Sequence, residues 1–118
     1  MKSTLVFVYN ADSGVFNALT DLAYKTFSPA TYACNLCALT YGTFGMRANW
    51  KEFLEKLNRS LEFLHADELR EKYGLTGVRL PAIFASEGAT VRLLIDDKKI
   101  NACRTIDDLK KLISEHVN

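Results

Sequence analysis

The segment TLVFVYN, residues 4–10, constrains the fold more than any other feature of this sequence. It is a nearly continuous run of β-branched and aromatic residues. Such a run is typical of a strand covered on both faces, whereas a strand with one solvated face alternates apolar and polar residues. The sequence therefore predicts a central strand in the interior of a sheet, with other elements packed on both sides of it.

A loop and a helix are predicted directly after this strand. The tetrapeptide ADSG offers Asp12 or Ser13 as a helix N-cap. Apolar side chains then recur on one face over residues 15–27, and Pro29 ends the pattern. A short loop that leads into a helix N-terminus also presents free backbone N–H groups, which suit a carboxylate or a phosphate. The loop is therefore a candidate for anion binding as well as for capping.

Two further helical segments are predicted before the second strand. Residues 33–41 indicate a short apolar helix or turn that Gly42 closes as a C-cap. In MRANWKEFLEKLN, residues 46–58, apolar side chains recur at helical spacing from Met46 onward. We expect an amphipathic helix there, with Trp50 in the core.

The rest of the chain completes an α/β pattern. In order, it predicts a strand at 61–65, a helix over 66–73, a β-hairpin over 82–96, a solvated turn at 96–99 and a final helix from Thr105. Gly74 ends the first of these helices, and Thr105 with Asp108 forms a capping box. A right-handed crossover makes the first two strands parallel neighbours, and the hairpin adds antiparallel strands. We expect a mixed four-stranded sheet with helices on both faces and an inserted helical segment after the first strand.

Composition and charge limit the classes of function. The 118-residue chain is 48% hydrophobic with two prolines, which is typical of a single domain over residues 1–118. Fifteen basic and fourteen acidic residues give a formal net charge of +1, which favours neither nucleic acid nor anionic lipid as a partner. The first apolar run is too short for a secretory signal or a transmembrane helix. We therefore expect a cytoplasmic protein with no membrane partner.

The second half of the chain resembles thioredoxin-fold proteins. The segments that show this resemblance are DELREKYGLTGVRLPAIFASEGATVRLLID, residues 67–96, and TIDDLKKLISEH, residues 105–116. TLVFVYN supplies the central strand. The resemblance implies a thioredoxin-like three-layer domain in which the Leu80–Pro81 peptide bond is cis and lies next to the active site. Without the resemblance, Pro81 is simply a residue that suits the start of a strand.

Two other segments resemble a group of small bacterial thioredoxin-like proteins. They are YNADSG, residues 9–14, and SPATYACNLCALTYG, residues 28–42. Some members of the group carry a GTPase label, but this sequence has no G-x-x-x-x-G-K-[ST] loop. In thioredoxin the cysteine pair directly follows the central strand, where this chain has NADSG; its own C-x-x-C pair comes later.

This pair, Cys34 and Cys37, has three interpretations. As a redox couple, Cys34 attacks a disulfide and Cys37 resolves the mixed disulfide, because residues three apart on a helical turn lie close enough to bond after a local adjustment. As half of a zinc site, the pair needs further ligands, for which Cys103, His65 and His116 are the candidates. As core residues, both thiols are simply buried.

Topology predicts where a site lies. The carboxyl ends of the two parallel strands and the start of the third strand meet at one edge of the sheet, where open α/β sheets bind ligands. His65 at this edge is either a solvated strand tip or the best acid/base candidate in the chain, because an imidazole titrates near neutral pH. The expected groove residues are Asp12, Ser13, His65, Leu80 and Pro81.

The sequence thus predicts a thiol–disulfide oxidoreductase in which Cys34 and Cys37 react with protein thiols or a small thiol substrate. No cofactor is expected, since the thiols carry the electrons themselves. Two alternatives stay open. One is a non-enzymatic domain of the same fold that binds a small molecule or a partner, and the other is a zinc site formed by Cys34, Cys37, Cys103 and His65.

Overall fold

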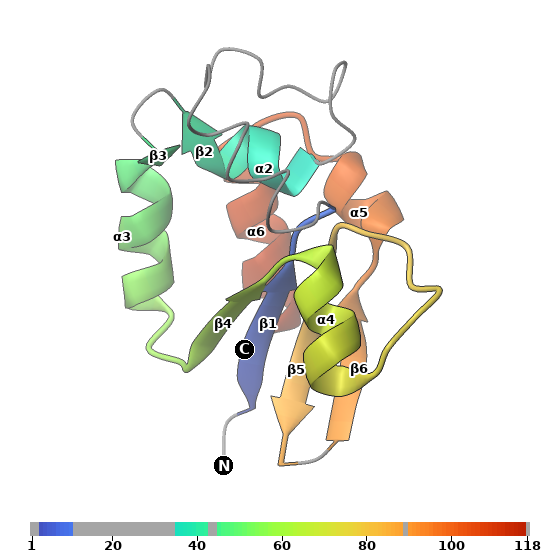
Figure 1. Cartoon of the computed structure of the whole chain (residues 1–118). Coiled ribbons are helices and arrows are strands. Elements are labelled where there is room, and N and C mark those ends of the chain that lie inside the picture. Colours follow the sequence, from blue (N-terminus) through green and yellow to red (C-terminus); the bar gives the residue numbers. More distant parts are fainter. Residues whose placement is uncertain (1–2, 11–34, 43–44, 89, 118) are drawn as a thin grey trace.

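A computed structural model describes residues 3–10, 35–42, 45–88 and 90–117 of the chain (Figure 1). Within these ranges, the side chains of residues 35, 37, 38, 41, 42 and 45 are not described. The predicted loop at Asp12 and Ser13, the predicted helix over 15–27 and Cys34 lie outside the described residues.

The main sheet has four strands in the order β4-β1-β5-β6. These are β1 (Thr4–Val8), β4 (Leu61–Leu64), β5 (Ala82–Glu87) and β6 (Thr90–Ile95). β1 runs parallel to β4 and antiparallel to β5, and β5 pairs with β6 as an antiparallel hairpin. The prediction of a mixed four-stranded sheet is therefore confirmed.

Helices cover both faces of this sheet. The helices are α2 (Asn35–Thr40), α3 (Ala48–Lys56), α4 (Ala66–Tyr73), α5 (Asp97–Asn101) and α6 (Ile106–His116). Leu5 and Phe7 of β1 pack in one core cluster with residues of α2, α3, α5 and α6, whereas Val6 and Val8 pack in a second cluster with α4. We call these sides the α3 face and the α4 face.

Burial of β1 explains its composition. Leu5, Val6, Phe7 and Val8 are all 0% exposed, so side chains of both orientations are removed from water. Full burial of such a side chain contributes about 1.5–3 kcal/mol. The continuous apolar run therefore specifies a strand with a helix layer on each side, as predicted.

Several helix-end signals in the sequence form the caps that they predict. Gly74 ends α4 in the left-handed conformation at φ 67°, and its N–H donates to the Arg70 carbonyl. Thr105 Oγ1 accepts from the Asp108 N–H at 3.1 Å, and Asp108 Oδ2 accepts from the Thr105 N–H at 3.3 Å. This reciprocal pair is the predicted capping box. Trp50 is fully buried in the α3 face, as expected.

Three local predictions were wrong. Gly42 does not cap α2 but lies in a short strand, β2 (Tyr41–Gly42), that pairs with β3 (Gly45–Met46). Met46 consequently belongs to β3, and α3 begins only at Ala48 because the extended Arg47 at φ −63° and ψ 141° precedes it. The hairpin removes Met46 from the helix, yet its side chain still packs against the same core.

The third difference concerns residues 96–99. These polar residues form the start of α5 rather than a solvated turn. Asp96 caps the helix by accepting from the Lys99 N–H at 2.9 Å, and Ile100 is fully buried. A good N-cap and one buried apolar side chain therefore stabilise a helix in a segment that looks fully polar.

Candidate functional site

The strand registers bring residues of three strands to one end of the sheet. Val8 of β1 lies opposite both Leu64 of β4 and Ala82 of β5. His65 directly follows the first of these partners, and Pro81 directly precedes the second. Since neighbouring strands lie about 4.8 Å apart, the β4 and β5 backbones are separated by roughly 10 Å at this end.

We call this end of the sheet the rim, and define it by Tyr9, His65, Pro81 and Asp96. Tyr9 continues β1 past its last paired residue and donates its N–H to the Leu64 carbonyl at 2.9 Å. Asp96 follows β6 at the same end, because Ile95 pairs with a residue next to the start of β5. The sequence analysis predicted that the ends of β1 and β4 meet the start of β5, and the strand registers confirm this.

The Leu80–Pro81 peptide bond is cis, as the sequence predicted. Pro81 is buried at the start of β5, and Leu80 packs against the core cluster of the α4 face. His65 instead lies on the α3 face, where its ring contacts Tyr9. Leu80 and His65 therefore share the rim but not one face of the sheet.

A carboxylate holds the His65 side chain. Glu68 Oε1 lies 2.6 Å from His65 Nδ1 and also accepts the His65 backbone N–H at 2.8 Å. Because an ionised carboxylate can only accept a hydrogen bond, Nδ1 carries a hydrogen. In the neutral imidazole, Nε2 is then the nitrogen without a hydrogen. The His65 side chain is 20% exposed.

Glu68 was not singled out by the sequence analysis, although a signal for it exists. It stands three residues after the helix N-cap His65, the spacing at which a Glu side chain reaches back to the N-cap backbone. A histidine at the N-cap position is unusual, because Ser, Thr, Asp and Asn are preferred there. The pattern H-x-x-E at a helix start therefore points to a fixed imidazole.

Stacked aromatic rings connect the rim to the core. The Tyr9 ring lies 5.7 Å from the His65 ring and 6.4 Å from Phe63, measured between centroids. Phe63 stacks on Phe7 at 5.0 Å, and Phe7 meets Trp50 edge to face at 5.8 Å. Such ring pairs add roughly 0.5–1.5 kcal/mol each beyond burial. The rim on the α3 face is therefore built on a rigid aromatic layer.

Helix α2 contacts α5 and α6, and α5 begins immediately after the rim residue Asp96 (Figure 1). Leu36 of α2 is 1% exposed and belongs to the same core cluster as Tyr9. The backbone of Cys37 lies in α2, and Cys34 precedes the first residue of this helix in the sequence. The structure thus places the helix of the C-x-x-C motif on the α3 face beside an element that starts at the rim.

Cys103 is a core residue. It is 9% exposed, and its Sγ donates to the Lys99 carbonyl oxygen at 3.6 Å. Burial raises the pKa of the Cys103 thiol, and the negative charge of Asp108 raises it further. Both effects keep the sulfur protonated, so Cys103 is a poor nucleophile and a poor metal ligand in this position.

In the part of the chain that the structure describes, no three His, Cys, Asp or Glu side chains cluster closely enough to hold a metal ion. Of the predicted zinc ligands, the structure describes the side chains of Cys103, His65 and His116 only.

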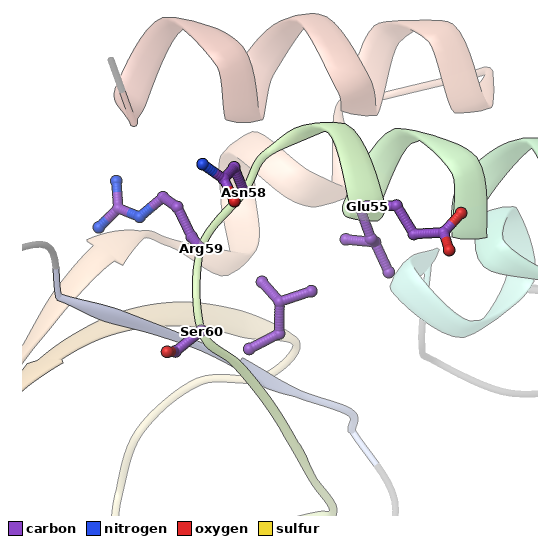
Figure 2. Close-up of a pocket in the computed structure, with 6 residues that line it drawn as sticks. Glu55, Asn58, Arg59 and Ser60 are labelled. Carbon is purple, nitrogen blue, oxygen red and sulfur yellow. The ribbon is translucent and has the colours of Figure 1, made fainter.

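A hollow of about 450 Å³ lies at the other end of the sheet. It is formed by Leu54, Glu55, Asn58, Arg59, Ser60 and Leu61, at the α3–β4 connection (Figure 2). The Ser60 carbonyl accepts the Leu5 N–H, which places the hollow next to the start of β1. The Arg59 guanidinium turns away from the hollow and bonds Ser3 and Val117. The hollow is therefore separate from the rim.

No family model matches this chain, and neither a curated protein nor a solved structure does. Among the helices in the described ranges, none has the length and apolar character that a membrane crossing requires.

Proposed function

We propose that the protein is a thioredoxin-like thiol–disulfide oxidoreductase that reacts through Cys34 and Cys37 at the rim. The observation that carries the proposal is the position of α2, the helix of the C-x-x-C motif. It packs on the α3 face against α5, which begins at the rim beside Pro81. The sheet order β4-β1-β5-β6, with the hairpin and α6 at the end of the chain, supports the thioredoxin-like assignment.

The proposed reaction needs the two thiols and a substrate disulfide. The Cys34 thiolate attacks one sulfur of the substrate, the substrate S–S bond breaks, and its second sulfur leaves as a thiol. Cys37 then attacks the mixed disulfide and releases the other substrate sulfur, so that the protein dithiol is oxidised as the substrate is reduced. The substrate class is a protein disulfide or the disulfide of a small thiol, and a cytoplasmic setting supplies thiols that reverse the reaction.

The sequence spacing of Cys34 and Cys37 favours pairing within this motif over pairing with Cys103. Residues at i and i+3 of a helical turn have Cβ atoms roughly 5–6 Å apart, near the distance that a disulfide needs. Cys103 is buried between α5 and α6, and burial raises the pKa of its thiol. The reactive pair is therefore Cys34 and Cys37, and Cys103 is best replaced in tests.

A Cys103→Ala protein provides the test. We expect two thiols to react with a soluble thiol reagent in the native protein, and incubation with oxidised glutathione to remove both reversibly. The matched control is the additional Cys37→Ser change, which leaves an attacking thiol but traps the mixed disulfide with glutathione, detectable by mass. Thiols that react only after denaturation would contradict the proposal.

A further inference from the structure

The outer edge of β6 has no partner strand in the described sheet. β6 is the last strand in the sheet order, so β5 pairs with one side of it and no described strand pairs with the other (Figure 1). The opposite edge strand, β4, has four residues, whereas β6 has six. Natural sheets protect their edges with short strands, lysine or proline, and the β6 sequence TVRLLI contains neither residue. This edge is therefore open to a further strand.

The hairpin determines which backbone groups of β6 point outward. Glu87 pairs with Thr90 across a two-residue loop, and the closing pair of such a hairpin is hydrogen-bonded. Bonded and non-bonded pairs alternate along an antiparallel ladder. Arg92 is therefore bonded to β5, whereas Val91 and Leu93 direct their N–H and C=O groups to the free edge. A β-bulge ends the regular pairing after Leu93.

The side chains of Val91 and Leu93 lie on the same face of the sheet. Val91 packs against the core cluster of the α4 face, and Leu93 pairs with Phe84, a member of that cluster. Leu93 is 49% exposed, and no other large apolar side chain of the described residues is as open to solvent. Apolar side chains beside outward backbone groups match an extended strand as the partner.

We propose that β6 is a dimer interface, at which it pairs in antiparallel orientation with β6 of a second copy of this chain. A two-fold axis at Arg92 places Val91 opposite Leu93 of the other copy. In this register every outward N–H and C=O of Val91 and Leu93 is bonded, and the two four-stranded sheets join into one. The two Val91 and two Leu93 side chains form one apolar group on the α4 face.

The symmetry of β6 favours a second copy over a strand of another protein. The two outward residues stand one on each side of Arg92, so the edge is complementary to itself. The formal net charge of +1 gives two copies little long-range repulsion. The proposal is independent of the thiol–disulfide exchange, because it uses Val91 and Leu93 and no residue of the rim.

Arg92 limits the strength of the dimer. Its side chain lies on the α3 face, opposite to that of Val91, and in the proposed register the two Arg92 Cβ atoms are roughly 4.5–5.5 Å apart. Like charges at this distance weaken strand pairing. Glu87 of the same chain is a diagonal neighbour of Arg92 on that face, which offsets part of the repulsion. We therefore expect a reversible dimer.

Sedimentation equilibrium tests the interface with the whole protein between about 10 μM and about 1 mM, the range for a reversible dimer. A reducing buffer prevents disulfide-linked dimers. We expect the wild-type protein to dimerise in this range and Leu93→Lys to weaken the dimer at least tenfold, because a charge on an open edge opposes pairing. Ala48→Lys is the control, since Ala48 is an exposed residue of α3, far from β6 (Figure 1).

A charge exchange at Arg92 tests the position of the two-fold axis. Arg92→Glu mixed with the wild-type protein places opposite charges across the axis. The mixed dimer should therefore be about tenfold tighter than either homodimer. Arg79→Glu makes the same change at an exposed residue of the α4–β5 connection, and its mixture with the wild-type protein should show no gain.

Three results would overturn the proposal. A wild-type protein that stays monomeric throughout the range has an edge that does not pair with itself, whatever other strand it binds. A dimer that Leu93→Lys leaves unchanged uses another surface. A mixture with Arg92→Glu that shows only the average of its two components contradicts the axis at Arg92. Should Leu93→Lys fail to fold in a thermal melt, the mixture decides, because Arg92 is an exposed residue.

Discussion

At the scale of single residues, Arg59 shows how one side chain joins distant parts of the chain. Its guanidinium donates to the Ser3 carbonyl at 2.9 Å, to the Ser3 hydroxyl at 2.7 Å and to the Val117 carbonyl at 3.1 Å. These contacts connect the α3–β4 loop, the start of β1 and the end of α6. Hydrogen bonds from a charged donor contribute more than neutral ones.

We expect Arg59→Ala to lower the free energy of unfolding by about 1.5–3 kcal/mol, the range for lost hydrogen bonds to a charged group. The expected cause is loss of the link between three segments, and the measurement is urea unfolding. Arg79→Ala is the control, because Arg79 is exposed in the α4–β5 connection. Equal unfolding midpoints for the two variants would show that the Arg59 contacts do not stabilise the fold.

At the scale of elements, the start of α6 illustrates a charge-dependent cap. The Arg104 backbone N–H donates to Asp108 and lowers the pKa of that carboxyl, and the Thr105 backbone and side chain lower it further. A carboxyl with a lowered pKa stabilises the fold above the pKa of the unfolded chain, and this contribution disappears as the pH falls through the folded value.

Acid unfolding tests this cap. Between pH 5 and pH 3, we expect Asp108→Asn to lose less unfolding free energy than the wild-type protein, since the variant lacks the charge whose protonation destabilises the cap. Asp107→Asn is the control in the same helical turn, and it should behave as the wild-type protein does. An Asp108→Asn protein with the same acid dependence as the wild-type protein would contradict this account.

The helices and strands differ in how well the sequence predicts them. β1, α4 and the hairpin follow local patterns, such as an unbroken apolar run or a glycine stop, and these were predicted. Residues 96–99 were predicted to form a turn because all four are polar. The helix that begins there depends on the burial of Ile100, and a local sequence pattern does not reveal that burial. Met46 was assigned to the wrong element because helical spacing alone does not reveal the pairing of β2 with β3.

At the scale of the whole molecule, the candidate site was predicted in part. Strand order and direction bring His65, Tyr9 and Pro81 to one rim, and these follow from topology. The partner of His65 was not foreseen, because the 2.6 Å contact with Glu68 depends on side-chain placement at the start of α4. Residues Asp12, Ser13 and Cys34 stay predictions, since they lie outside the described residues.

Metal removal discriminates between the proposed oxidoreductase and the zinc alternative. Exchange requires free thiolates, whereas zinc would occupy the same sulfurs. We therefore expect dialysis against EDTA to leave the rate of exchange with oxidised glutathione unchanged. Release of about one equivalent of zinc, with loss of the metal in Cys34→Ser, would instead establish the zinc site.

The Arg59 contacts have a consequence for the connectivity of the chain. One guanidinium bonds both Ser3 and Val117, so their backbones lie within about 10 Å of each other. A few glycines would span that gap, and circular permutants opened at the β5–β6 hairpin would retain every strand neighbour of the sheet. The rim lies at the far end of the sheet, so such a rearrangement of chain order would leave the arrangement of its residues intact.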